Sequence, residues 1–188
     1  MATGDAVAEA MAAVPREGFL PESERRHAAY DGPLPIGHGQ TNSQPRTVAD
    51  MLRLLDVRPG QRVLDVGSGS GWTTGILAHL VGSAGSVVGV ELVPELVAFG
   101  RQNLAATGQP WARIEQAEEG VFGLPRDAPY DRILVSAEST HLHGELVEQL
   151  ADGARMVIPV DGRMLVVERD GEEVRTSEHG WYRFVPLR

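Results

Sequence analysis

A hydrophobic run rich in β-branched residues leads into three spaced glycines in the stretch Arg62-Val63-Leu64-Asp65-Val66-Gly67-Ser68-Gly69-Ser70-Gly71. The run predicts a short buried strand, and the segment that follows, residues 72–81, predicts a helix. Because glycine lacks a Cβ atom, the loop between them can bring its backbone close to a ligand. We therefore expect a strand, a glycine loop and a helix, and the rest of the fold is predicted outward from this unit.

The same alternation of strands and helices continues on both sides of this unit, separated by Gly and Pro. The further expected strands are 86–90, 112–116, 131–136 and 155–160, and the further expected helices are 44–56, 94–106 and 143–150. Alternation of this kind predicts an α/β fold, a doubly wound, mainly parallel sheet with helices on both faces. Ligands bind such sheets at the carboxyl ends of the strands.

The two ends of the chain depart from this alternation. Residues 1–14 predict a short helix, and the many prolines and glycines of residues 15–39 predict an irregular loop or flap. Residues 164–169, 173–176 and 182–185 predict antiparallel strands at the C-terminal edge of the sheet. We expect one domain over residues 1–188, with an N-terminal helix and substrate-side loops in 1–43 and the core in 44–188.

Charge and composition exclude several classes of function. The 188 residues carry 17 Lys and Arg against 26 Asp and Glu, and this net charge of -9 argues against a nucleic-acid partner. The chain has no cysteine, which excludes disulfides, thiolate metal sites and a cysteine nucleophile. No basic secretion signal is recognisable, and no apolar stretch approaches the about 20 residues that cross a bilayer. We expect a cytoplasmic protein with no membrane partner.

The glycine loop and one acidic residue form the strongest signal for a binding site. The glycines follow the pattern Gly-x-Gly-x-Gly after an acid, which differs from the pattern of pyrophosphate-binding loops and from a P-loop. Glu91 ends the next expected strand, about 20 residues further on, where a carboxylate can accept hydrogen bonds from both ribose hydroxyls. The alternative interpretation is a tight turn and a solvated acid at the end of a strand. Together the two features favour a nucleoside cofactor over a phosphate ligand.

The segment from Asp65 to Gly71, together with Glu91, resembles the cofactor site of Rossmann-like methyltransferases that use S-adenosylmethionine. Further blocks resemble protein-L-isoaspartate O-methyltransferases in particular, and they follow the order of that family over nearly the whole chain. These blocks are Val14-Pro15-Arg16-Glu17-Gly18-Phe19-Leu20-Pro21, the proline-rich stretch 33–45, Ala128-Pro129-Tyr130-Asp131 and Phe184-Val185-Pro186-Leu187.

The resemblance implies an enzyme that moves a methyl group from S-adenosylmethionine to the free carboxyl of L-isoaspartyl residues in damaged proteins or peptides, leaving S-adenosylhomocysteine. Such methylation is a step in protein repair. By resemblance, the cofactor-binding residues are Asp65, Gly67, Ser68, Gly69, Gly71, Glu91 and Glu119. The resemblance also places Ser43, helped by Thr41, beside the reacting carboxylate.

Elementary chemistry agrees with hydroxyl groups at the reacting centre. A carboxylate is already a nucleophile at neutral pH, so the enzyme needs mainly to align it with the methyl donor. Neutral hydroxyl donors hold the carboxylate without stabilising its ground state too strongly. Ser43 also stands where a helix N-cap is expected, and the two roles are compatible.

Several positions depart from the pattern of the family. Asn42 replaces an apolar residue between Thr41 and Ser43, and Glu118 and Glu119 replace a Gly-Asp pair near the expected adenine. Asp31 lies in a shortened segment before the proline-rich block, where it is either a functional residue or a turn residue. Glu138 replaces a small residue on the expected acceptor side.

Histidines and alternative functions complete the sequence predictions. His141 and His143 follow Glu138, but their spacing and the lack of further clustered ligands argue against a metal site. Trp72 is expected either near the cofactor or in the core. Two other functions stay open, a carboxyl methyltransferase with a different acceptor, such as an aspartyl residue of a biosynthetic peptide, and a non-catalytic cofactor-binding paralogue.

Overall fold

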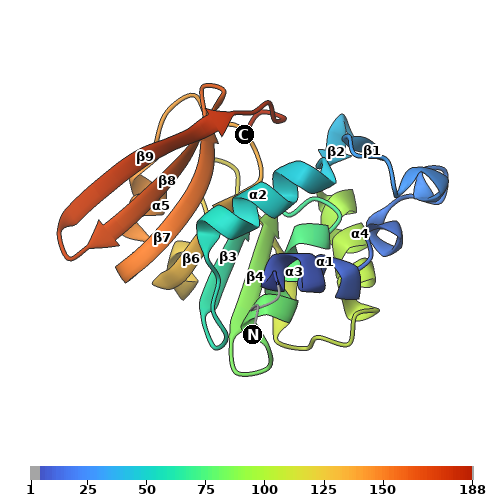
Figure 1. The fold of residues 1–188 in the computed structure, drawn as a ribbon, viewed down its shortest axis with the longest axis horizontal. Helices are drawn as coiled ribbons and strands as arrows, with labels where there is room; N and C mark the ends of the chain where they lie inside the picture. Colours follow the sequence, from blue (N-terminus) through green and yellow to red (C-terminus); the bar gives the residue numbers. More distant parts are fainter. Residues whose placement is uncertain (1–4, 188) are drawn as a thin grey trace.

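Short hydrophobic strands alternate with helices and build one seven-stranded sheet in the computed structural model, which describes residues 5–187 (Figure 1). The strands are β3 (Arg62–Val66), β4 (Ser86–Glu91), β5 (Ala112–Gln116), β6 (Tyr130–Val135), β7 (Leu150–Val160), β8 (Arg163–Asp170) and β9 (Glu173–Trp181). Their order is β5-β4-β3-β6-β7-β8-β9, and the first five are parallel while β8 and β9 run antiparallel to their neighbours. The predicted sheet and its antiparallel edge are confirmed.

Helices cover both faces of this sheet. They are α1 (Ala6–Ala13), α2 (Pro45–Leu55), α3 (Trp72–Val81), α4 (Pro94–Ala105) and α5 (Gly144–Glu148). One core lies beneath α1, α2 and α3 and takes from the strands Val63, Val87, Leu134 and Val157. A second core on the opposite face lies beside α5 and takes from the same strands Leu64, Val88, Ile133 and Met156. Strands buried on both faces explain why these segments are hydrophobic without alternation.

The N-terminal region is more regular than the sequence predicts. After the 3-10 turns η1 (Arg16–Phe19) and η2 (Arg25–His27), the chain forms a hairpin of β1 (Leu34–Gly37) and β2 (Gln40–Asn42). Leu34 and Ile36 are buried while their neighbours in the strand are exposed, so buried and exposed residues alternate as is typical of a strand. The turn of the hairpin holds His38 at a φ of 55° on the surface.

Helix α2 begins differently from the prediction. Its N-cap residue is Gln44, whose side chain makes no capping hydrogen bond to the backbone of the first turn, so the expectation that Ser43 caps the helix is wrong. Asp31, which lies 15 residues before Arg46 in the chain, caps the helix instead, because its Oδ1 accepts a hydrogen bond of 3.1 Å from the backbone N–H of Arg46. The carboxylate also pairs with the guanidinium of Arg46 at 3.3 Å. A negative charge at a helix N-terminus is favourable.

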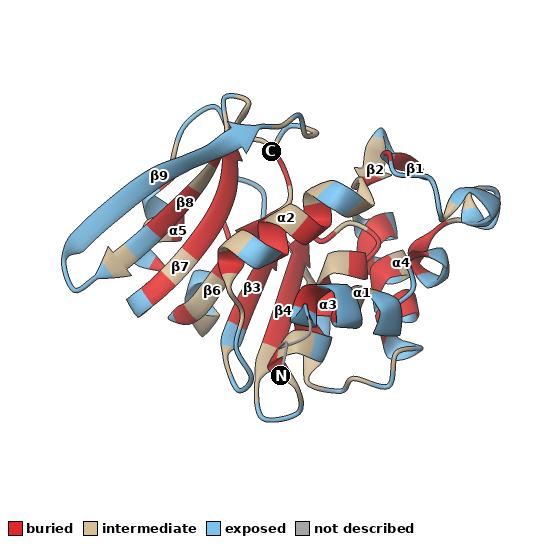
Figure 2. Cartoon of the chain, viewed as in Figure 1, coloured by how far each residue is buried: buried red, intermediate tan, exposed pale blue. Residues whose placement is uncertain are grey.

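Elements near the C-terminus also differ from their predicted bounds. The predicted strand 173–176 continues to Trp181, whereas the predicted strand 182–185 is wrong, because these residues make single hydrogen bonds instead of a ladder. The predicted helix 143–150 is shorter, since β7 already begins at Leu150. Strand β9 is exposed along its whole length at the edge of the sheet (Figure 2).

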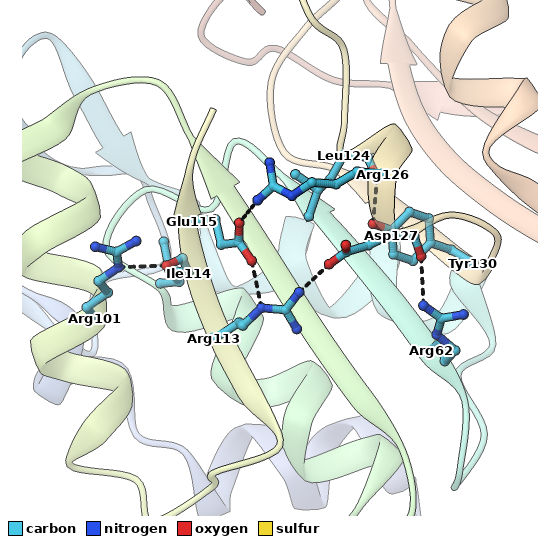
Figure 3. Close-up of polar contacts among 9 residues, drawn as sticks. All are labelled: Arg62, Arg101, Arg113, Ile114, Glu115, Leu124, Arg126, Asp127 and Tyr130. Atoms are coloured by element: carbon cyan, nitrogen blue, oxygen red, sulfur yellow. Dashed lines mark hydrogen bonds and ion pairs between the residues drawn. The ribbon is translucent and has the colours of Figure 1, made fainter. Parts of the chain in front are cut away.

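The crossover from β5 to β6 contains the 3-10 turn η3 (Pro125–Asp127) and, in residues 117–129, no α-helix. Ion pairs fasten it to the sheet, with Arg113 lying between Glu115 and Asp127, and Arg126 reaching back to Glu115 (Figure 3). These pairs are partly exposed, so each contributes little stability alone. The buried hydroxyl of Tyr130 donates to the carbonyl of Leu124 at 2.9 Å and fixes the end of the crossover. In the described residues no helix is long and apolar enough to cross a membrane.

Candidate functional site

A cavity lies at the carboxyl ends of the parallel strands, where the order of the sheet reverses around β3. The strand ends that line it contribute Val66, Gly67, Val90, Glu91, Ala117, Glu118, Ser136 and Ala137. The hairpin β1–β2, the crossover and the C-terminal segment close it with Ile36, Gln40, Thr41, Val121, Phe122, Gly123, Val185, Pro186 and Leu187. We call this space the cofactor cavity.

The glycine loop turns its N–H groups toward β4. Gly67 and Ser68 both donate to the carbonyl of Val90, at 2.9 and 3.0 Å, and Gly69 donates to Glu91 Oε2 at 2.9 Å. These groups are not free to cradle a phosphate, in agreement with the sequence analysis. Gly67 and Gly69 have φ values of 78° and 52° and line the cavity with bare backbone.

Two glycines outside the loop make its close packing possible. A Cβ atom on Gly89 in β4 would stand 2.8 Å from the Cβ of Ser68, and one on Gly100 in α4 would stand 3.0 Å from the carbonyl oxygen of Gly69. Gly71 likewise packs against α4, since its Cβ would lie 3.2 Å from the Gly100 carbonyl. The sequence analysis did not single out Gly89 or Gly100, although a glycine inside a strand is itself a signal of close approach.

Glu91 is placed to accept hydrogen bonds inside the cavity. Its side chain is buried, Oε2 accepts from Gly69 and Oε1 accepts from the N–H of Val93 at 2.9 Å. A carboxylate has about four acceptor positions, so two are left for a ligand. The two backbone bonds fix the orientation of these remaining positions.

Asp65 lies behind the loop and does not line the cavity. Its carboxylate is fully buried, and it accepts hydrogen bonds from Thr74 Oγ1 at 2.7 Å and from Ser136 Oγ at 3.1 Å. Burial raises the pKa of Asp65 to about 6, and the two hydroxyl donors oppose this rise. Ser136 does line the cavity, so Asp65 holds a residue of the cavity wall in place.

A second cavity adjoins the first at the hydroxyl loop, residues 40–43. Thr41 and Ser43 line it, and Thr41 lines the cofactor cavity as well. Its other walls come from α2, with Arg46 and Asp50, and from the end of β9 and the residues after it, with Trp181, Tyr182 and Arg183. We call this space the acceptor cavity. Among residues 5–187 neither hydroxyl has a hydrogen-bond partner, so both can donate to a ligand.

A buried arginine supports the hydroxyl loop. Arg16 is 5% exposed, and its guanidinium donates to Asn42 Oδ1 at 2.7 Å and to the carbonyls of Tyr30, Gly32, Asn42 and Ser43 at 2.8 to 3.0 Å. Burial lowers the pKa of Arg16 to about 10, and the negative charge of Asp31 opposes this change. The guanidinium also lies 5.5 Å from the ring centre of Trp72, which is a core residue outside both cavities.

Asn42 connects the hydroxyl loop to the glycine loop. Its side chain is buried, and Nδ2 donates to Ser70 Oγ at 3.2 Å while Oδ1 receives the bond from Arg16. The polar residue that departs from the family pattern therefore faces the interior and not the acceptor cavity. The sequence analysis missed Arg16 and this connection because the partners lie far apart in the chain.

The remaining predicted residues lie at different distances from the cofactor cavity. Ser68 is buried beside Gly89, and its hydroxyl has no partner among the described residues. Glu118 lines the cavity, whereas Glu119 lies in an exposed turn outside its lining. His143 stacks on Phe122 with a ring separation of 3.7 Å, and burial lowers its pKa. The described part of the chain contains no group of three metal-ligating side chains.

Comparison with known proteins gives consistent matches. The family model described as protein-L-isoaspartate(D-aspartate) O-methyltransferase (PCMT) matches residues 1–188. A protein-L-isoaspartate O-methyltransferase of Methanopyrus kandleri is 48% identical over 186 residues, which cover 96% of this chain and 82% of the relative.

Solved structures of two proteins described as members of this enzyme class have a similar fold. A Plasmodium falciparum protein described as a member of the same enzyme class, in complex with S-adenosyl-L-homocysteine, has a TM-score of 0.84 and 28% identity over 100% of this chain and 92% of its own. Another structure, described as a protein-L-isoaspartate O-methyltransferase, has a TM-score of 0.89 and 24% identity, and the match covers 98% of this chain and 62% of that one. The expected Rossmann-like methyltransferase fold is confirmed.

The raised pKa of Asp65 predicts a specific dependence of stability on pH. Between its usual value of 3.8 and about 6, the folded protein keeps a proton that the unfolded chain has lost. The contribution of Asp65 to the free energy of unfolding should therefore fall as the pH rises through this range and change no further above it. Urea unfolding of wild type and of Asp65→Asn at several pH values measures this, since the difference between them isolates Asp65. A difference that stays constant from pH 4 to 7 would contradict the assignment.

Proposed function

Because the chain belongs to the protein-L-isoaspartate O-methyltransferase family, we propose a role for each part of the site in the reaction of that family. The protein transfers a methyl group from S-adenosylmethionine to the carboxyl group of L-isoaspartyl residues, and S-adenosylmethionine is its cofactor. One observation carries the assignment of roles, namely that Thr41 lines both cavities. The hydroxyl loop thus lies where cofactor and acceptor must meet.

The cofactor cavity has the chemistry that a nucleoside cofactor requires. Glu91 offers two free acceptor positions to the ribose hydroxyls, and the bare backbone of Gly67 and Gly69 allows close approach. Ile36, Phe122 and other apolar residues form walls that suit a flat base. When bound, S-adenosylmethionine supplies an electrophilic methyl group on a positively charged sulfur.

The acceptor cavity has the chemistry that a carboxylate acceptor requires. The Ser43 hydroxyl donates to one oxygen of the acceptor carboxylate, and Thr41 orients it at the junction of the cavities. A carboxylate needs no general base, so the protein contributes alignment and removes competing water contacts. Arg16 and Asn42 hold the loop that carries both hydroxyls.

The other predictions have different kinds of support. Asp65, Ser68 and Gly71 support the loop from behind, and we propose that they act through packing and hydrogen bonds. Glu119 as an adenine-side residue stays a prediction, as do the single domain over residues 1–188, the cytoplasmic location and the absence of a nucleic-acid partner. Isoaspartyl-containing proteins or peptides are the proposed partners, and protein repair is the proposed purpose.

Removal of the Glu91 carboxylate should weaken cofactor binding. Hydrogen bonds to charged groups contribute about 1.5 to 3 kcal/mol, so the dissociation constant of S-adenosylmethionine should rise about 10- to 100-fold in Glu91→Gln. Isothermal titration calorimetry measures this. Glu172→Gln, which changes an exposed carboxyl in the turn between β8 and β9, is the matched control. Unchanged affinity in Glu91→Gln would contradict the ribose assignment.

Transfer of a labelled methyl group to two peptides that differ only in an isoaspartyl or aspartyl residue tests the acceptor. Wild type should label the isoaspartyl peptide alone, and Ser43→Ala should lower kcat by about 10- to 100-fold because one hydrogen bond to the reacting carboxylate is lost. Ser177→Ala, which removes an exposed hydroxyl on β9, should leave kcat unchanged.

Other outcomes of this experiment favour the remaining alternatives. Equal labelling of both peptides would indicate a carboxyl methyltransferase with a broader or different acceptor. Binding of S-adenosylmethionine without labelling of either peptide would favour a non-catalytic paralogue or an acceptor of another kind. A Ser43→Ala variant with unchanged kcat would remove Ser43 from the reaction.

A further inference from the structure

Glu138 lies just after β6 and connects three parts of the molecule. Its carboxylate accepts two backbone hydrogen bonds, one from the N–H of Gly162 at 2.8 Å through Oε1 and one from the N–H of Phe184 at 3.1 Å through Oε2. Gly162 belongs to the turn between β7 and β8, and Phe184 begins the C-terminal segment, residues 184–187. Each carboxylate oxygen therefore holds a different part of the chain.

The backbone of Glu138 holds the same C-terminal segment. Its N–H donates to the carbonyl of Val185 at 2.7 Å, and its carbonyl accepts from the N–H of Leu187 at 2.7 Å. With the bond from Phe184, three hydrogen bonds join Glu138 to three of the four residues of this segment, Phe184, Val185 and Leu187. This pattern explains why residues 182–185 do not form the strand that their sequence predicts.

The C-terminal segment forms part of both cavities. Val185, Pro186 and Leu187 line the cofactor cavity, and Phe184 and Val185 line the acceptor cavity. The two residues before Glu138, Ser136 and Ala137, line the cofactor cavity from the end of β6. The position of the segment thus determines whether one wall of the cofactor cavity is complete.

We propose that Glu138 is a positioning residue whose carboxylate holds residues 184–187 as a wall of the cofactor cavity. The inference rests on the proposed function in one respect, that this cavity binds S-adenosylmethionine. A carboxylate that accepts backbone N–H bonds forms stronger hydrogen bonds than a neutral acceptor. Without it, the segment keeps only the bonds to the Glu138 backbone, and cofactor binding must then also order the segment.

The test compares Glu138→Ala and Glu138→Gln with wild type, and Glu172→Gln is again the matched control. Hydrogen exchange of the ligand-free proteins reports the segment directly. The amide of Phe184 should exchange about 10-fold faster in Glu138→Ala, because its charged acceptor is gone. The amide of Leu187, whose acceptor is a backbone carbonyl, should change less. Glutamine keeps one acceptor oxygen, so Glu138→Gln should lie between wild type and Glu138→Ala.

Calorimetric binding of S-adenosylhomocysteine to the same proteins reports the consequence for the cavity. The dissociation constant should rise about 10-fold in Glu138→Ala and by a smaller factor in Glu138→Gln. In methyl transfer, KM for S-adenosylmethionine should rise while kcat at saturation changes little, because Glu138 touches no reacting atom. A general loss of folding would instead lower the apparent kcat without raising KM, and it would speed exchange at amides throughout the protein and not at Phe184 selectively.

The outcomes separate this inference from the proposed function. If wild type and Glu138→Ala bind S-adenosylhomocysteine equally, or if the Phe184 amide exchanges equally in both, the inference is wrong while the proposed function stands. If wild type itself does not bind S-adenosylhomocysteine, the proposed function is wrong and the inference falls with it. Weaker binding together with faster Phe184 exchange, both partly restored in Glu138→Gln, would support the inference.

Discussion

The buried guanidinium of Arg16 is the constraint on which the site depends. A cation with almost no exposure is costly unless its donors are satisfied, and here carbonyl and amide oxygens of two segments accept hydrogen bonds from them. These acceptors come from the Tyr30 to Gly32 segment and from the hydroxyl loop. A lysine at this position could not serve so many acceptors in one plane. The folded N-terminal region is thus tied to the functional loop.

The hydrogen bonds of Arg16 also determine where the hydroxyl loop lies. Asn42 accepts from Arg16 and donates to Ser70, so the loop with Thr41 and Ser43 is fixed against the glycine loop. The hydroxyls can then align a carboxylate without first being ordered by it, which is how preorganisation lowers a barrier. Glu138 fixes the opposite boundary of the cofactor cavity through the C-terminal segment. The contacts of Arg16 and those of Glu138 both position loops, and the sheet holds the segments from which these loops extend.

Local patterns predicted the sheet, the glycine loop and Glu91, because each depends on residues that lie near one another in the sequence. The role of Arg16 could not be read in this way, since its partners lie 14 to 27 residues away. The capping of α2 by Asp31 and the irregular course of residues 182–185 depend likewise on distant contacts. Resemblance located Thr41 and Ser43, but only the fold shows that the loop borders two cavities.

A crystal structure with S-adenosylhomocysteine and an isoaspartyl peptide bound tests the central claim most directly, namely that the hydroxyl loop aligns the acceptor carboxylate where the two cavities meet. We expect one carboxylate oxygen about 2.6 to 3.0 Å from Ser43 Oγ and beside Thr41, with the cofactor sulfur facing that carboxylate across the junction of the two cavities. A carboxylate held instead by Arg46 or Arg183, with the Ser43 hydroxyl unpaired, would contradict this account.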